Sequence, residues 1–226
     1  MRPYEKIIRT TAKKILEPEK LFQLGNSRCY LDDNGYFTVQ VEFQPVTYMH
    51  GSSLNVGVAF LWEATKELNN TLARDYGGDA GVSFVEYRDD DSFKAEMEVL
   101  MKTALEKVKE YRKFSDMEYA KKCLQAKIAD TPHGQQFWEW YHLAMLCFLK
   151  GDYADGKAAF EQYLEILRNS FYRENVYIEW KENFYNYCIE NIECNLTSKD
   201  DARRMVVDMI NRRREFFGEK MFHKMY

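Results

Sequence analysis

Two kinds of hydrophobic pattern follow one another along the chain. Residues 3–16 carry apolar side chains at helical spacing, which predicts an N-terminal helix that ends before Pro18. Apolar and polar residues then alternate over 37–43 and 54–62, which predicts two half-buried strands. Asn34-Gly35, just before the first of these strands, is typical of a β-hairpin turn because both residues accept a positive φ. We therefore expect an antiparallel sheet early in the chain.

The second predicted strand has one face of small side chains. Asn55, Gly57 and Ala59 alternate with large apolar residues. A face of small side chains indicates that another element packs closely on it, and we expect this element to be the first helix. Residues 63–76 are expected to form a short helix, and 82–87 a further strand.

From residue 92 onward the hydrophobic pattern is helical throughout. It predicts six helices in three pairs, at 92–129, 136–168 and 172–217. Within the last pair, 171–194 is expected to be one helix with two apolar faces. Such a helix has two neighbours, so the pairs should stack on one another.

Helix ends carry further signals. Ser115 and Glu118 have the spacing of a capping box, and Ser198 is the predicted N-cap of the last helix, which should end at Gly218. The fold class expected is α+β, with an N-terminal helix on a small antiparallel sheet followed by an all-helical C-terminal half of stacked helix pairs. The expected domains are 1–90 and 91–226.

Composition narrows the classes of function. The 226 residues carry a formal net charge of −4, whereas nucleic-acid and membrane-surface binders usually have a basic excess. The N-terminal twenty residues lack the apolar core of a signal peptide, and five cysteines form no CxxC pair. We therefore expect a cytoplasmic protein that binds neither nucleic acid nor membrane. Arginines of the last helix are scattered around it as on a solvated surface, except Arg213, which lies in the apolar stripe.

No motif in the sequence has the spacing of a known cofactor or metal site. Asp89-Asp90-Asp91 lacks the spacing of a calcium-binding loop, and the glycines of 77–81 lack the ending of a phosphate-binding loop. The four histidines form neither an HxxxH nor an HExxH arrangement. We expect no cofactor and no metal ion.

Residues 138–168 resemble a single tetratricopeptide-like helical hairpin. Trp140, Tyr141, Gly151-Asp152-Tyr153 and Phe160 fall where that repeat has its aromatic, turn and packing residues. Gly156 stands where the repeat prefers alanine, so a small residue is kept at a close helix crossing. Tyr163 is larger than the repeat usually has at its position. The resemblance implies a helix pair and carries only a weak suggestion of protein binding.

Residues 1–130 resemble, in layout, an uncharacterised bacterial family of unknown function. The matching pieces are the Asp33–Gly35 turn, the Val41–Gln44 strand end, Val56-Gly57-Val58 and the helical segment from Ser92 to Met117. The resemblance implies a bacterial protein and brings no activity with it.

Three functions remain open. The first is a non-enzymatic module that binds a protein or peptide, since tyrosine and tryptophan are typical interface anchors. Its candidate binding residues are Trp138, Tyr141, His142, Tyr172 and Trp180. The second is an enzyme with a site on the polar face of the first strand and its adjoining loop. Its weak candidates are Gln40, Glu42, Gln44, Tyr48 and His50. The third is an immunity-type protein that blocks a toxin partner.

Overall fold

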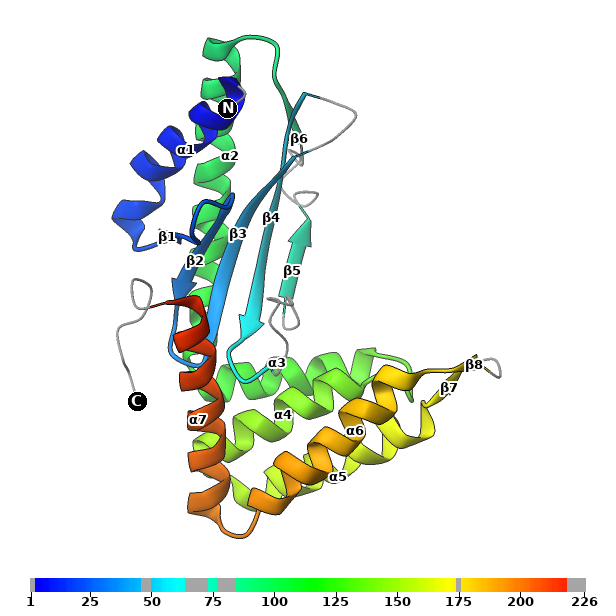
Figure 1. The fold of residues 1–226 in the computed structure, drawn as a ribbon. Helices are drawn as coiled ribbons and strands as arrows, with labels where there is room; N and C mark the ends of the chain where they lie inside the picture. Colours follow the sequence, from blue (N-terminus) through cyan, green and yellow to red (C-terminus); the bar gives the residue numbers. More distant parts are fainter. Residues whose placement is uncertain (1–2, 46–49, 64–72, 77–83, 174–175, 219–226) are drawn as a thin grey trace. The chain divides into compact units, whose positions relative to one another are not determined.

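The computed structural model describes residues 3–45, 50–63, 73–76, 84–173 and 176–218 (Figure 1). The chain divides into two compact units. The sheet unit consists of residues 1–61, 65–113 and 214–226, and the helical unit of residues 62–64 and 114–213. The long helix that begins near residue 90, which the sequence assigned to the helical domain, is thus grouped with the sheet.

Among its described residues, the sheet unit contains two complete α-helices and the end of a third. Its helical segments are α1 (Pro3–Ile15), the 3-10 helix η1 (Glu17–Glu19), α2 (Asp90–Tyr111) and the part of α7 (Lys199–Phe217) from Arg214 onward. Its strands are β1 (Phe22–Gln23), β2 (Cys29–Asp33), β3 (Phe37–Pro45), β4 (Gly51–Phe60), β5 (Ala73–Tyr76) and β6 (Phe84–Glu86). The 3-10 helix η2 (Arg112–Ser115) leads from this unit into the next.

All the strand pairs of this sheet are antiparallel. The strands follow the order β1-β2-β3-β4-β5, and β6 also pairs with β4. The hairpin between β2 and β3 forms where Asn34-Gly35 predicts it, with Gly35 at φ 91° and Asn34 N donating to Phe37 O at 2.9 Å. The long β3–β4 pair, in which Val41 faces Val56, forms the centre of the sheet.

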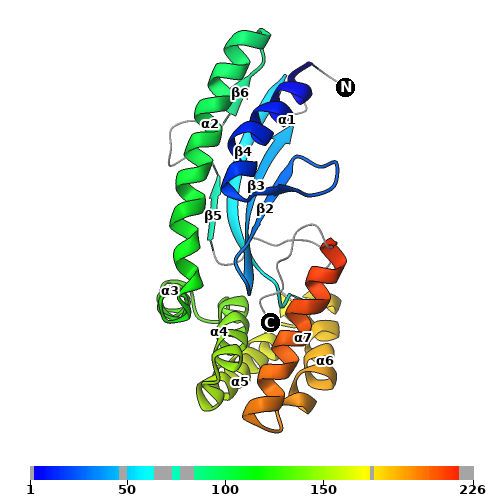
Figure 2. The same ribbon diagram turned by 90° about the vertical axis from the view of Figure 1, so that its left-hand side faces the viewer.

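One face of the sheet is covered by α1 and α2, which lie side by side (Figure 2). Arg112, which follows α2, donates to the Asp32 carboxylate at 2.9 Å, and Asp32 is the direct cross-strand partner of Val39. Directly paired residues of an antiparallel ladder point to the same face, so the helices cover the face that carries the large apolar side chains. The expectation that α1 packs on the face of β4 with small side chains was wrong. The small side chains of Asn55, Gly57 and Ala59 lie on the opposite face, because the large apolar side chains of β4 supply more contact area for the helices.

The helical unit contains two helix pairs and a small hairpin. Its elements are α3 (Met117–Asp130), α4 (Phe137–Lys150), α5 (Tyr153–Asn169), β7 (Tyr172–Arg173), β8 (Val176–Tyr177), α6 (Glu179–Asn191), the 3-10 helix η3 (Glu193–Asn195) and most of α7 (Lys199–Phe217). The tight turn between α4 and α5 uses Gly151, whose φ of 92° suits a residue without a side chain, and its N–H closes α4 onto Cys147 O at 2.9 Å.

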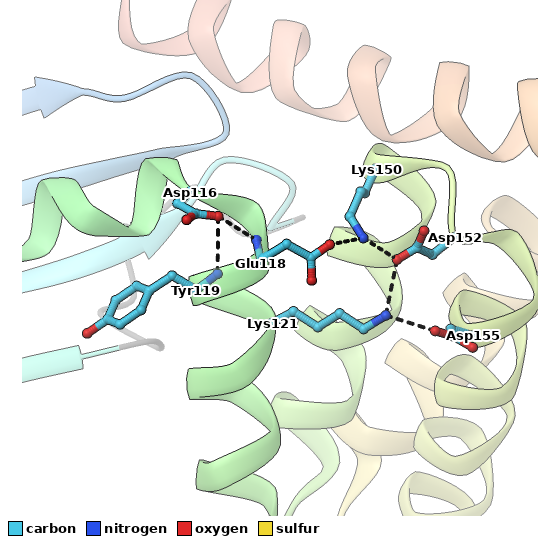
Figure 3. Close-up of polar contacts among 7 residues, drawn as sticks. All are labelled: Asp116, Glu118, Tyr119, Lys121, Lys150, Asp152 and Asp155. Carbon is cyan, nitrogen blue, oxygen red and sulfur yellow. Dashed lines mark hydrogen bonds and ion pairs between the residues drawn. The ribbon is translucent and has the colours of Figure 1, made fainter.

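A cluster of charges joins α3 to the α4–α5 turn (Figure 3). Lys121 bonds Asp152 at 3.1 Å and Asp155 at 2.8 Å, and Lys150 contacts both Asp152 and Glu118. Burial lowers the pKa of Lys121, but the bonds to Asp155 and Asp152 outweigh it and raise the pKa above its usual value. The cluster therefore fixes three helices at one point.

Three local predictions need correction. The N-cap of α3 is Asp116 rather than Ser115, since its carboxylate accepts from Glu118 N at 2.9 Å while the Glu118 side chain goes to Lys150. Of the predicted helix 63–76, the residues Ala73–Tyr76 form a strand, and 64–72 lie outside the described residues. The predicted helix 171–194 is instead the β7–β8 hairpin followed by α6.

The fold class is α+β as the sequence predicts, with an N-terminal helix, an antiparallel sheet and a helical C-terminal half. Ser198 caps α7 by accepting from Asp201 N at 3.2 Å, and the helix ends before Gly218 as expected. Among the described residues, no helix combines the length and the apolar character needed to cross a membrane.

Candidate functional site

The five candidate binding residues fall into a buried group and an exposed group. Tyr141 is fully buried and His142 is 1% exposed, whereas Trp138, one turn earlier on α4, is half-buried. Trp138 stacks on His142 with ring centres 6.1 Å apart and meets Tyr141 edge to face at 6.0 Å. These three residues therefore form one aromatic cluster, of which only Trp138 has surface to offer to a partner.

The His142 ring is fixed by groups far away in the sequence. Its Nδ1 accepts a hydrogen bond from the indole Nε1 of Trp62 at 3.1 Å, and its Nε2 lies 3.8 Å from the Glu63 carboxylate. Burial lowers the pKa of His142 to about 3, and the charge of Lys127 acts in the same direction. His142 is thus a neutral, structural imidazole at pH 7.

The phenols of the cluster are structural as well. The Tyr141 hydroxyl donates to Trp62 O at 3.3 Å, and the Tyr163 hydroxyl lies 3.6 Å from Cys188 Sγ. Burial raises the pKa of both tyrosines far above the usual value, so neither ionises near neutral pH. These residues hold α4, α5 and α6 together and are not placed for proton transfer.

The exposed group lies on the β7–β8 hairpin and the first turn of α6. Tyr172 is 67% exposed, Val176 65%, Trp180 50% and Tyr177 44%. Tyr172 and Tyr177 are directly paired across the two strands, with ring centres 5.5 Å apart. In Figure 1 the hairpin stands at the ends of α5 and α6. We call these four residues the aromatic patch.

Phe137 connects the aromatic patch to the buried cluster. Its ring lies 6.2 Å from Trp180 on one side and 5.2 Å from Trp138 on the other. The Lys181 ammonium lies 5.2 Å from the Phe137 ring centre and 5.8 Å from that of Trp180, within the range of a cation–π contact. Trp180 is therefore held by the helical unit although half of its surface is exposed.

The alternative site on the sheet is only partly assembled. Gln44 Nε2 donates to the Glu42 carboxylate at 3.0 Å, and Gln40, two residues before Glu42, is buried. His50 is exposed just before β4, and Tyr48 lies outside the described residues. The side chains of Gln40, Glu42 and Gln44 share the face opposite α1 and α2.

Among the described residues, no three histidine, cysteine, aspartate or glutamate side chains lie together in a way that could hold a metal ion. Cys29 lies opposite Glu42 in the sheet. Burial, together with the Glu42 charge, raises the pKa of Cys29 to about 12, and a hydrogen bond with Gln40 acts in the other direction. The thiol stays protonated and is a poor nucleophile.

Helical spacing predicts a helix at Val176 and Tyr177, so their exposure on a hairpin is not expected from the sequence. Tyr172-Arg173 and Val176-Tyr177 are too short to carry a strand pattern, and the residues between them are not of the Asn-Gly type that signals a hairpin. The bond between Trp62 and His142 had no local signal, because 80 residues separate the two side chains.

Comparison of the chain with protein-family models, with curated proteins and with solved structures finds no match.

Proposed function

We propose that this protein is a non-enzymatic binding protein that takes a protein or peptide partner on its aromatic patch. The observation that carries the proposal is the concentration of exposed apolar side chains at Tyr172, Val176, Tyr177 and Trp180, all within one short stretch of chain. Tyrosine and tryptophan are the residue types that most often dominate binding energy at protein interfaces. Their grouping on one hairpin and the first turn of the helix that follows it favours a specific contact over chance exposure.

Energetics favour coverage of the patch by a partner. Each buried aromatic side chain removes about 150–250 Å² from water, and apolar burial contributes roughly 25 cal/mol per Å². A two-stranded hairpin is marginally stable in water by itself. A partner that covers Tyr172 and Tyr177 would therefore gain apolar contact and stabilise the hairpin at the same time.

Preorganisation further supports binding at this place. Trp180 is held by Phe137 and Lys181, and the Tyr177 hydroxyl donates a hydrogen bond to the Glu182 carboxylate. Side chains that are already ordered lose little rotamer entropy when a partner arrives. The packing that positions α4 against α6 comes from Trp138, Tyr141 and His142.

The test is quantitative affinity capture with the purified full chain from a lysate of its native cells. The patch variant is Tyr172→Ser/Trp180→Ser, and the matched control is Tyr119→Ser, an exposed tyrosine of the same unit on α3. Both changes remove exposed aromatic surface, so circular dichroism should show both variants folded. We expect a stoichiometric partner that the wild type and Tyr119→Ser retain and the patch variant loses.

Retention of the same partner by the patch variant would contradict the proposal, as would capture of none by the wild type. Sedimentation of the purified chain adds a second outcome, because concentration-dependent dimers lost in the patch variant would make the partner a second copy. The immunity-type hypothesis is the special case in which the captured partner is a toxin.

A further inference from the structure

The polar surface that adjoins the aromatic patch is acidic. Residues 176–195, from β8 to the end of η3, contain four glutamates and one lysine. The glutamates are Glu179, Glu182, Glu190 and Glu193, and the lysine is Lys181. Glu179, Glu190 and Glu193 are exposed, whereas Glu182 is half-buried. An excess of negative charge thus begins beside Trp180 and continues along α6.

The exposed carboxylates have no cation of their own. In the part of the chain that the structure describes, Glu179, Glu190 and Glu193 take part in no ion pair. The Glu182 carboxylate differs from them, because it accepts a hydrogen bond from the Tyr177 hydroxyl. Three carboxylates of this stretch are therefore left to water or to a partner.

The stability of α6 does not account for the carboxylates at its far end. Glu190 lies in the last turn of α6, which contains no basic residue, and Glu193 follows in η3. The C-terminus of a helix carries a partial negative charge, so a carboxylate there is unfavourable for the helix itself. Glu179 lies in the first turn, where a carboxylate is favourable. A cationic partner would give Glu190 and Glu193 the attraction that the helix does not.

The rings of the aromatic patch suit a cation as well. The Lys181 ammonium lies 5.8 Å from the Trp180 ring centre, so this ring already takes part in a cation–π contact within the fold. Tyr172 is 67% exposed and Tyr177 44%, so both offer ring surface to a partner. The planar guanidinium of arginine stacks on aromatic rings and also pairs with carboxylates. Arginine is thus the side chain that fits both the patch and the acidic surface beside it.

We propose that the partner presents a cationic segment in which arginines alternate with apolar residues. The inference rests on the proposed function, since it names the chemistry of the partner that the aromatic patch takes. Apolar side chains and guanidinium groups of the segment cover the patch, and further arginines pair with Glu179 and Glu190. These two glutamates are eleven positions apart on α6, roughly 16 Å along its axis. About five residues of extended chain span this distance, so a short linear peptide is long enough.

Selection from a peptide library tests the chemistry of the partner. A displayed library of random twelve-residue peptides is panned on the purified full chain, and peptides that also bind Tyr172→Ser/Trp180→Ser are removed. We expect the remaining peptides to be enriched in arginine together with apolar residues. Patch-dependent peptides of neutral or acidic composition would overturn this inference and leave the proposed function standing. If no patch-dependent peptide is found, both fail, and binding of the chain to phosphatidylcholine vesicles would then assign the patch to a lipid surface.

Charge variants of the full chain locate the contact. Fluorescence anisotropy measures the dissociation constant of a labelled peptide from the selection. Glu179→Lys/Glu190→Lys should weaken its binding about tenfold or more, because attraction becomes repulsion at two places. The matched control is Glu106→Lys/Glu110→Lys, which makes the same change of net charge at exposed positions of α2 and should bind as wild type does.

A milder variant guards against effects of charge reversal on folding. Glu179→Gln/Glu190→Gln removes the two charges and should weaken binding about threefold. Raising the salt concentration from about 0.05 M to about 0.5 M should weaken binding to the wild type and change it little in this variant. Unchanged affinity in both Glu179/Glu190 variants would overturn the inference, as would equal weakening in the α2 control.

Discussion

Trp62 and His142 are 80 residues apart in the sequence and are joined by a hydrogen bond of 3.1 Å in the core of the helical unit. The indole can only donate, so the imidazole nitrogen that faces it must be unprotonated. Burial removes the ring from water, which disfavours its charged form and lowers the pKa of His142 to about 3. The bond therefore ties the stability of the helical unit to pH.

The first prediction is a loss of stability in mild acid that depends on His142. Because the folded pKa lies below the unfolded value of 6.5, the unfolded chain binds a proton between these two values and the folded chain does not. Stability is thus full above pH 6.5 and falls as pH decreases toward 3. We expect about 2 kcal/mol to be lost between pH 7 and pH 5 on this account.

Urea denaturation at pH 7 and pH 5 checks this prediction with two variants. In His142→Gln the pH-dependent difference should shrink by about 2 kcal/mol, whereas His133→Gln, at an exposed loop position, should behave as wild type. An unchanged pH dependence in His142→Gln would show that the ring is solvated or protonated in the folded state.

The second prediction concerns the ion pair of Arg214 and Asp33 in the sheet unit. Arg214 Nη2 donates to Asp33 Oδ1 at 2.9 Å, and both side chains are buried. Loss of the guanidinium leaves a buried carboxylate without its cation, so Arg214→Met should cost about 3–5 kcal/mol of unfolding free energy. Arg212→Met, at an exposed position of the same helix, should cost less than about 0.5 kcal/mol.

A compensating change separates the charge effect from lost packing. The substitution Asp33→Asn keeps a side-chain oxygen that can accept from Gly35 N but removes the charge, so Arg214→Met/Asp33→Asn should be more stable than Arg214→Met alone. If chemical denaturation shows the double variant to be no better than the single one, the arginine acts through its stem rather than its charge.

The sequence predicts most of the architecture because hydrophobic spacing reports which face of an element is buried. The β3–β4 alternation and the α4–α5 pair follow from this spacing alone. Arg214 could not be found in the same way, since it bonds Asp33 and Gly35 O in a turn that lies far away in the sequence. Long-range polar partners are invisible to a local pattern.

The candidate site illustrates the same limit. The exposed aromatic residues Tyr172 and Trp180 can be singled out by type, but helical spacing also accommodates Val176 and Tyr177, so the pattern predicts a helix where the hairpin forms. Periodicity cannot distinguish the two when only a few apolar residues are involved. In the described part of the chain, the buried atoms Thr38 Oγ1 and Asn55 Nδ2 have no hydrogen-bond partner. Whether a buried polar atom finds a partner depends on what the rest of the fold brings near it, which composition does not encode.

The third prediction tests the charge cluster at the α4–α5 turn. Lys121 is largely buried between Asp152 and Asp155, whereas Asp155 is well exposed. Lys121→Met should lower stability by about 1 kcal/mol, because the pairs lie near the surface and Lys150 still neutralises Asp152. The difference from wild type should diminish in about 1 M salt, where screening weakens the pairs.

Thermal unfolding at low and high salt measures this difference, and Lys122→Met provides the control because Lys122 is the exposed neighbour on α3. A salt-independent loss in Lys121→Met would assign the effect to packing of the lysine stem instead of to its charge.

The fourth prediction concerns the crossing of α4 and α5 at Gly156. A Cβ at this position would lie 2.5 Å from Cδ1 and 2.6 Å from Cε1 of Phe148, closer than carbon atoms approach. Gly156→Ala gains about 1 kcal/mol of helix propensity but must displace the buried Phe148 ring, at a typical cost of about 1–3 kcal/mol or more. The clash should outweigh the gain in helix propensity, so Gly156→Ala should be less stable than wild type in chemical denaturation.

Phe148→Leu alone should also destabilise by leaving a cavity, but Gly156→Ala/Phe148→Leu should be more stable than the sum of the two single changes predicts. Strict additivity would mean that the two residues do not touch in solution, and that the glycine is needed there for another reason.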